Sequence, residues 1–99
     1  LEPFRPTHPG EVLKDELEYR GISQKQLAAE MGISYTLLNE VLNGKRQVNT
    51  ELALLVEAAL DIPAESLLQM QARYNMLTAK RNKSFMEKLQ NVRKIVAAL

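Results

Sequence analysis

Apolar residues recur at every third or fourth position along most of this chain, which is the period of an α-helix. No run alternates apolar and polar residues in the way that a half-buried strand does. The sequence therefore predicts an all-α fold. Glycine, proline and short polar residues mark the helix ends, giving five helices: Pro9 to Gly21, Ser23 to Gly32, Ser34 to Gly44, Asn49 or Thr50 to Asp61, and about Ala64 to Ala79.

The inward faces of these helices supply a candidate core. Proline is tolerated in the first turn of a helix, so Pro9 suits a helix start, with Glu11 near the positive end of the helix dipole. The apolar stripes expected to face the core are Val12, Leu13 and Leu17 in the first helix and Leu52, Val56, Ala59 and Leu60 in the fourth. In the fifth helix, Leu67, Met70, Tyr74 and Leu77 lie on one side. The 99 residues suffice for one modest core.

Residues 23–46 are the most distinctive segment, because they predict two short helices joined by a tight turn. Ser23 is a suitable N-cap, and Gln26 three residues later can return the bond as in a capping box. Gly32 supplies the left-handed residue that ends the first of the two helices, and Ser34 caps the second. Such a pair lets the second helix enter a DNA groove while the first helix braces it.

The outward face of the second helix in this pair is polar. Its outward residues are Tyr35, Thr36, Asn39, Glu40 and Asn43, and its inward residues are Leu38, Val41 and Leu42. Side chains that hydrogen-bond from an exposed helix face are what reading of base edges requires. The plainer alternative is an ordinary helical hairpin with a solvated outer face. The combination of Ala28, Gly32, Ile33 and Asn43-Gly44-Lys45 at these spacings disfavours it.

The net charge of +1 hides an asymmetry along the chain. Residues 71–99 carry seven basic side chains and one acid, Glu87, whereas residues 1–70 carry six basic side chains and eleven acids. Neutralisation of phosphates usually supplies much of the affinity for DNA. An acidic body therefore has to bind DNA through a few well-placed groups, through dimerisation or through its basic tail.

The chain offers little material for catalysis or for metal binding. It has no cysteine and a single histidine, His8, so no metal site of ordinary ligand spacing is expected. A lone histidine before a proline suits a helix cap or a surface ring. We find no nucleophile with its base and no glycine-rich phosphate loop, so we expect neither enzymatic activity nor a cofactor. With no apolar run of membrane-spanning length and no signal-peptide pattern, we expect no membrane partner and a cytoplasmic location.

The last part of the chain is predicted to be a helical extension, residues 80–99, of a domain formed by residues 1–79. A charged stretch from Lys80 to Ser84 precedes an apolar seam with heptad-like spacing, formed by Phe85, Leu89, Val92, Val96 and Leu99. Two heptads are too short for a stable free helix, so the seam has to pack on something. It can pack on its own core, on a second copy of the chain or on another partner, and the charged stretch favours the external choices.

These motifs together resemble the lambda-repressor-like helix-turn-helix family and, within it, the HigA-type antitoxins. The resemblance to the helix-turn-helix family covers roughly residues 10–70. The more specific resemblance to the HigA-type antitoxins is carried by Pro6-Thr7-His8-Pro9-Gly10-Glu11-Val12-Leu13, Gly21-Ile22-Ser23-Gln24 and Leu42-Asn43-Gly44-Lys45-Arg46. It implies a five-helix lambda-repressor-like DNA-binding domain with an additional C-terminal helix. It also implies a dimer that binds a palindromic operator, represses its own operon and neutralises a cognate toxin, a RelE-like mRNA endonuclease.

The family pattern also implies roles for individual residues. The residues expected to face base edges are Tyr35, Thr36, Asn39 and Glu40, and those expected to contact phosphates are Gln24, Ser34, Asn43, Lys45 and Arg46. The chain departs from the pattern at Leu37, where a small hydroxyl residue is common, and at Glu40, where a basic residue is frequent. A glutamate there can accept a hydrogen bond from cytosine N4, although it repels phosphate.

Two other functions fit the same residues. The first is a stand-alone helix-turn-helix regulator whose C-terminal helices serve only dimerisation. The second is a helical protein-interaction module that no longer reads DNA, which the acidic body favours. A neighbouring reading frame that codes for a small basic protein would favour the antitoxin.

Overall fold

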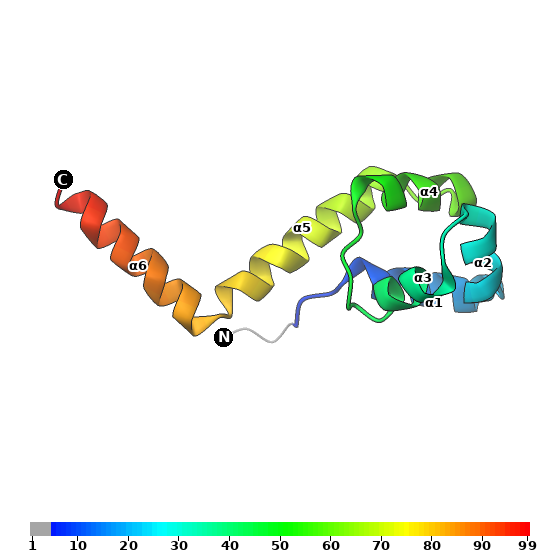
Figure 1. Ribbon diagram of the computed structural model, residues 1–99, viewed down its shortest axis with the longest axis horizontal. Helices are drawn as coiled ribbons and strands as arrows, with labels where there is room; N and C mark the ends of the chain where they lie inside the picture. The colour runs from blue at the N-terminus through cyan, green and yellow to red at the C-terminus, as the bar shows by residue number, and fades with distance from the viewer. Residues whose placement is uncertain (1–4) are drawn as a thin grey trace.

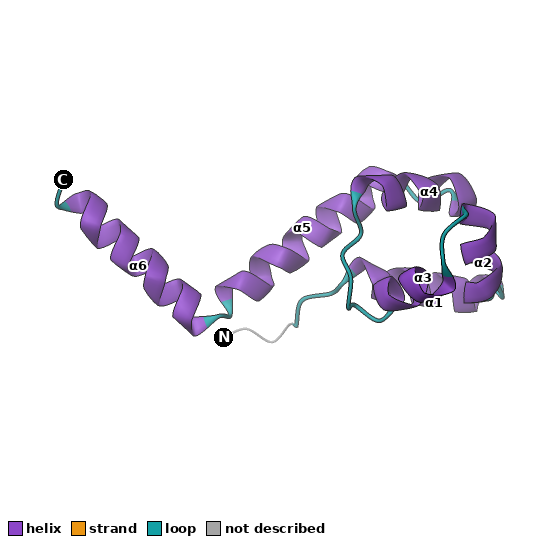
Figure 2. Ribbon diagram, viewed as in Figure 1, coloured by secondary structure: helices purple, strands orange, loops and turns teal. Residues whose placement is uncertain are grey.

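The structure, a computed structural model, describes residues 5–99, which form six α-helices and no strand (Figures 1 and 2). The first four residues of the predicted domain lie outside the described range. The helices are α1 (Pro9–Arg20), α2 (Gln24–Met31), α3 (Tyr35–Leu42), α4 (Thr50–Leu60), α5 (Ala64–Lys80) and α6 (Lys83–Ala97). The all-α prediction is confirmed, and the predicted helix ends agree with the structure to within one or two residues.

Local capping chemistry explains why the helices begin where they do. Three predicted N-cap side chains accept a backbone N–H in the first turn: Ser23 from Gln26, Ser34 from Leu37 and Asn49 from Leu52, at 2.9 to 3.0 Å. Between α2 and α3, Gly32 adopts the left-handed conformation at φ 71°, which ends α2 and directs the chain into the turn. The tight helix-turn-helix geometry is therefore encoded within its own segment.

One capping prediction is wrong in its location. Among residues 5–99, the Gln26 side chain returns no hydrogen bond to Ser23, and it lies exposed. The reciprocal capping box is at the start of α1 instead, where His8 Nδ1 accepts from the Gly10 N–H at 2.9 Å and Glu11 accepts from the His8 N–H at 3.3 Å. Arg5 holds the Glu11 carboxylate with two further bonds at 2.7 and 3.1 Å, which fixes it over the cap.

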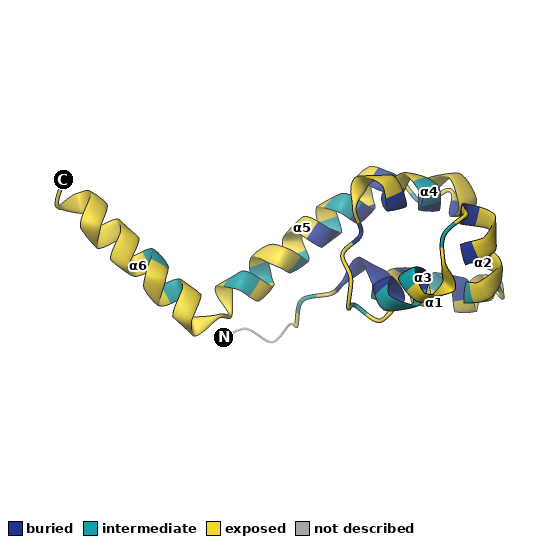
Figure 3. Cartoon of the chain, in the orientation of Figure 1, coloured by how far each residue is buried: buried dark blue, intermediate teal, exposed yellow. Residues whose placement is uncertain are grey.

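The core joins α1–α5 and the loop before α4, and α6 contributes no buried residue (Figure 3). The buried apolar residues are Leu13, Leu17, Leu27, Ala28, Met31, Leu38, Val41, Leu42, Val48, Leu52, Ala53, Val56, Leu60, Ala64 and Leu67. Two residues expected in the core, Val12 and Ala59, are exposed. Helical spacing alone misplaced them, because it shows which residues share a helix face but not how much of that face the rest of the fold covers.

The helices α1–α4 and the start of α5 form one body, from which the rest of α5 and then α6 extend as an arm (Figure 1). The chain measures 56 × 28 × 23 Å, with a radius of gyration of 17.2 Å. A compact domain of this length has a radius of gyration of about 13 Å. Since α6 turns away from α5 at Arg81 and Asn82 and projects away from the body, its apolar seam is left uncovered within one copy.

Candidate DNA-binding surface

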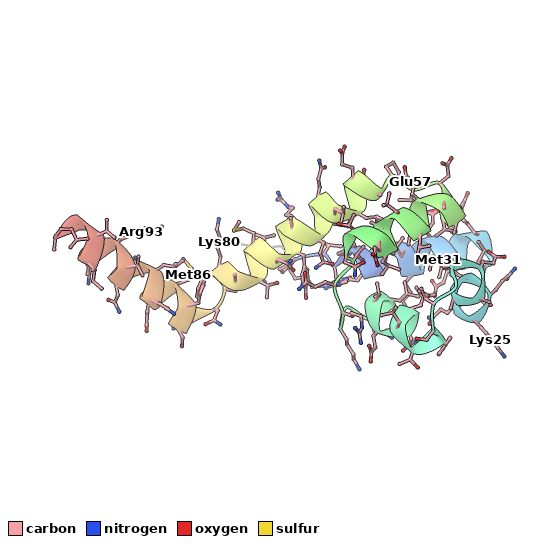
Figure 4. The ribbon with its side chains drawn as sticks, turned by 45° about the horizontal axis from the view of Figure 1, so that its top comes forward. Lys25, Met31, Glu57, Lys80, Met86 and Arg93 are labelled. Carbon is pink, nitrogen blue, oxygen red and sulfur yellow. The ribbon has the colours of Figure 1, made fainter. Side chains whose placement is uncertain are left out.

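The unit formed by α2 and α3 presents one exposed helix face on a firmly packed base. Leu38 and Val41 of α3 are completely buried, with no exposed surface. On α2, Met31 faces the interior while Lys25 points away into solvent (Figure 4). The opposite side of α3 is left for an external ligand, as the sequence predicted.

The first turn of α3 carries two predicted base-contacting residues with open surroundings. Tyr35 is 51% exposed and Thr36 is also exposed, and neither side chain hydrogen-bonds to any other residue in the range 5–99. Ser34 precedes them, and its Oγ accepts from the Leu37 N–H at 3.0 Å. The Ser34 hydroxyl keeps its own hydrogen free to donate to a phosphate, because capping uses the oxygen only as an acceptor.

A row of side-chain hydrogen bonds runs along the exposed face from α2 through α3 to α1. Asn39 Nδ2 donates to Gln24 Oε1 at 2.9 Å, and Asn43 Nδ2 donates to the Asn39 backbone oxygen at 2.9 Å and to its Oδ1 at 3.2 Å. Lys14 Nζ then donates to Asn43 Oδ1 at 3.3 Å. The row holds three of the predicted contact residues, Gln24, Asn39 and Asn43, in fixed orientations. It leaves the side-chain amide NH2 of Gln24 as a donor toward solvent.

The structure pairs Glu40, predicted to contact a base, with Arg46, predicted to contact a phosphate. Arg46 Nε and Nη2 donate to the same carboxylate oxygen of Glu40, at 2.9 and 2.8 Å. The loop that brings them together is held by the Lys45 N–H, which donates to the Glu40 backbone oxygen at 2.8 Å. The exposed Lys45 side chain forms no ion pair with the described residues and is therefore the free cation of this loop.

His8 is a buried helix cap next to this loop. The residue is only 2% exposed, and its ring lies edge-on to Tyr74 at a centroid distance of 4.9 Å. Burial lowers the pKa of His8, against smaller opposing effects of Glu11 and of the Arg46 backbone. Since Nδ1 accepts the Gly10 N–H, the ring is neutral there. The cap alternative for His8 is thus confirmed, and the surface-ring alternative is wrong.

Sequence reasoning missed one residue of this surface, Lys14, and one tertiary contact beneath it, that of His8 with Tyr74. Lys14 lies on α1, 29 positions before its partner Asn43, and no local pattern signals such a pairing. His8 was recognised as a possible cap, but its contact with α5 through Tyr74 depends on the tertiary fold. Together these two contacts tie α3 and the loop after it to α1 and α5.

The predicted C-terminal seam lies along α6, apart from the polar surface. Phe85, Val92 and Val96 are exposed and Leu89 is half-buried, whereas Leu99 lies beyond the end of α6 at 99% exposure. Figure 4 shows Met86 and Arg93 on the same helix, well away from the body. Packing of the seam on the body of its own copy, one of the three alternatives, is not what the structure shows.

No helix in the part of the chain from residue 5 to residue 99 is long and apolar enough to cross a membrane.

Comparison with known proteins places this architecture in a family. The family profile described as Helix-turn-helix (HTH_3) matches residues 13–67. Virulence-associated protein A' of Dichelobacter nodosus is 32% identical over 72 residues, which is 72% of this chain, and the chain spans 63% of that protein's length.

Two solved structures share the fold and most of the length. An addiction module antidote protein of the HigA family from Coxiella burnetii is 32% identical with a TM-score of 0.76, over 86% of this chain and 95% of that one. The Pseudomonas aeruginosa antitoxin HigA, solved with the higBA promoter, is 27% identical with a TM-score of 0.78, over 88% and 94% of the two chains. The chain therefore belongs to the helix-turn-helix family and, within it, to the HigA-type antidote proteins.

Proposed function

We propose that this protein is an antitoxin that binds operator DNA as a dimer, represses its own operon and neutralises a RelE-like mRNA endonuclease toxin. The observation that carries the proposal is the exposed polar face of α3, along which Asn39 and Asn43 are held in place by the Gln24–Asn39–Asn43–Lys14 row. The similar antitoxin from P. aeruginosa was solved with its promoter, which supports DNA as the ligand of this face.

The proposed contacts divide into two groups. Tyr35, Thr36, Asn39 and Glu40 face the base edges in the major groove, and Gln24, Ser34, Asn43, Lys45 and Arg46 contact the phosphates on either side. Contacts of the second kind position the protein, and those of the first kind carry the sequence preference. The bond to Asn39 uses only the side-chain oxygen of Gln24. The side-chain amide NH2 of Gln24 is therefore well suited to donate to a phosphate oxygen.

The seam on α6 supports the proposed dimer. Burial of a large apolar side chain contributes roughly 1.5–3 kcal/mol, and the seam offers Phe85, Leu89, Val92 and Val96 without cover from their own body. A dimer with one recognition helix in each copy binds a palindrome whose half-sites lie about 34 Å apart. Footprinting should therefore show symmetric protection, and protection of a single half-site would contradict the dimer.

A basic toxin surface is the proposed partner of the acidic body. The outward acids of α1 are Glu11, Asp15, Glu16 and Glu18. Two of them are already paired, Glu11 with Arg5 at 2.7 Å and Glu16 with Arg20 at 3.0 Å, so Asp15 and Glu18 offer the uncompensated charge. A toxin that cleaves mRNA carries a positive surface for the RNA backbone, which an acidic protein can cover.

The DNA-binding role is tested by two substitutions with different expected effects. Asn39→Ala should change the preferred sequence and weaken operator binding by about 1–3 kcal/mol, because it removes a base contact. Lys45→Ala should weaken binding to all sequences alike and reduce the salt slope by about one unit, because it removes a phosphate contact. Lys94→Ala, which removes the same charge from α6, serves as the control. Unchanged affinity and sequence preference in Asn39→Ala would show that the reading face is wrongly assigned.

The antitoxin role is tested by expression with the neighbouring reading frame. If that frame encodes a small basic protein that arrests growth alone, expression of this chain should restore growth, and the two proteins should purify together. Restored translation should accompany the complex, because the toxin is proposed to cleave mRNA. Operator binding without any interaction with the neighbour's product would favour the stand-alone regulator instead.

A further inference from the structure

The ion pair between Glu40 and Arg46 joins a residue proposed to face a base to one proposed to contact a phosphate. Both Arg46 nitrogens, Nε and Nη2, donate to a single carboxylate oxygen of Glu40. The other oxygen of Glu40 and the Nη1 group of Arg46 form no hydrogen bond within residues 5–99. The pair therefore has an open acceptor at the α3 end and an open donor at the loop end.

A backbone hydrogen bond holds the start of the loop against Glu40. Lys45 N–H donates to the Glu40 backbone oxygen at 2.8 Å, which keeps the neighbouring Arg46 within reach of the Glu40 carboxylate. The side chains remain accessible, with Glu40 at 36% and Arg46 at 55% exposure. A guanidinium held by a carboxylate is a weaker general phosphate ligand than a free one, because the negative charge beside it repels the phosphate.

We propose that Glu40 is a specificity-determining residue, and that it makes the phosphate contact of Arg46 depend on the base in front of Glu40. This inference rests on the proposed DNA-binding function and identifies the kind of base edge that this part of the site selects, one that presents an amino donor such as cytosine N4. At a cytosine, the N4 amino group donates to the open oxygen of Glu40 while Arg46 stays paired and its Nη1 reaches the phosphate. At guanine or thymine, the carboxylate meets an acceptor and is repelled, so the pair loses its position and Arg46 its contact.

The low number of cations near this surface makes such coupling consequential. Residues 1–70 carry an excess of five negative charges, and the loop after α3 contributes only Lys45 and Arg46. Because Glu40 counters one of these two cations, unspecific attraction to the DNA backbone is held low. A larger share of the affinity is then available only at the correct sequence, which is how a repulsive element produces specificity.

The experiment compares Glu40→Gln with Glu57→Gln, each of which removes one negative charge. Glu57 is an exposed residue of α4 that forms no ion pair within residues 5–99 (Figure 4). The dissociation constant of each full-length variant is measured for the DNA upstream of its own coding sequence and for unrelated DNA of equal length. The specificity ratio is the dissociation constant for unrelated DNA divided by the dissociation constant for the upstream DNA.

Glu40→Gln should lower the specificity ratio by about fivefold or more, because a good polar contact to a base discriminates by at least that factor. Glu57→Gln should leave the ratio within about twofold of the wild type, since it acts only through overall charge. On operators in which each cytosine of the half-site is replaced in turn, the wild type should lose affinity at one position where Glu40→Gln does not. Equal ratios in the two variants would overturn the proposal.

A second background tests whether Arg46 takes part. When Arg46→Ala is already present, Glu40→Gln should lower the specificity ratio by clearly less than it does alone, because the phosphate contact that Glu40 controls is gone. The same fold-change with and without Arg46 would show that the two residues act independently and would refute the coupling. A wild-type chain with no preference for the upstream DNA would contradict the proposed function itself, a result distinct from a failure of the variants.

Discussion

Gly10→Ala is expected to destabilise the protein and displace α3, although alanine is the better helix former. Gly10 lies in the first turn of α1, where this helix contacts the end of α3. A Cβ atom at this position would lie 1.9 Å from the backbone oxygen of Val41, 2.8 Å from its carbonyl carbon and 3.0 Å from His8 Nδ1. These neighbours are mostly backbone, so no flexible side chain can turn aside to relieve the contact.

The magnitude follows from two opposing effects. Helix propensity favours alanine over glycine by about 1 kcal/mol in a helix interior. Against this, α1 and α3 have to separate by about 1 Å, and overpacking of a well-filled interface costs about 1–3 kcal/mol, occasionally more. The displacement also stretches the cap bond from Gly10 to His8, now 2.9 Å long. We expect a net loss of roughly 2 kcal/mol, which is a fall in melting temperature of roughly 10 °C for a domain of this size.

Urea denaturation monitored by circular dichroism measures the free energy of unfolding. The affinity of the folded protein for operator DNA reports whether α3 has moved. Gly21→Ala is the matched control, because Gly21 has φ 70° and nothing within 4 Å of an added Cβ. It should cost about 1–2 kcal/mol through backbone strain alone and leave operator affinity unchanged. A Gly10→Ala protein as stable as the wild type, or one with unchanged operator affinity, would refute the reasoning about the α1–α3 contact.

Three further outcomes are expected. Because burial lowers the pKa of His8, the unfolded state binds a proton first as the pH falls below the ordinary value of 6.5, so the unfolding free energy should decline there by up to about 1.4 kcal/mol per pH unit. Urea titrations at several pH values should lose this decline in His8→Asn. Gln71→Leu should cost about 1–3 kcal/mol in the same assay, because the buried Val48 N–H loses its acceptor at 2.8 Å, whereas Gln69→Leu, exposed on the same helix, should cost little. In sedimentation, Val92→Lys should weaken self-association and Gln90→Lys should not, and equal behaviour would exclude the seam as the dimer contact.

The sequence by itself determined the helices and their ends. Serine and asparagine caps, left-handed glycines and apolar spacing act within a few residues of the chain, so a reader of the sequence has all the interacting groups in view. This is why the turn between α2 and α3 was predicted correctly, and why the residues facing outward on α3 could be named from the sequence.

The tertiary structure decided what those outward residues contact. Lys14 meets Asn43 across 29 positions, and Gln71 meets Val48 across 23. Such pairs depend on how whole helices cross, which no local pattern contains. For the same reason the exposure of Val12 could not be predicted from the sequence. Helix propensity would count Gly10 as an unfavourable residue, whereas the structure needs glycine there because the backbone of Val41 approaches closely.

The two ends of the chain show the same division. The sequence identified an apolar seam on a helix too short to stand alone, a local property that α6 retains. Only the fold shows that the seam projects from the body and that α6 contributes no residue to the core of that body. At the other end, a histidine before a proline indicated a cap, but burial against Tyr74 required α5 to return to α1. Helix caps and apolar periodicity involve residues within a few positions of one another, so the sequence shows them directly. The packing of one helix on another depends on contacts between residues that lie far apart in the sequence.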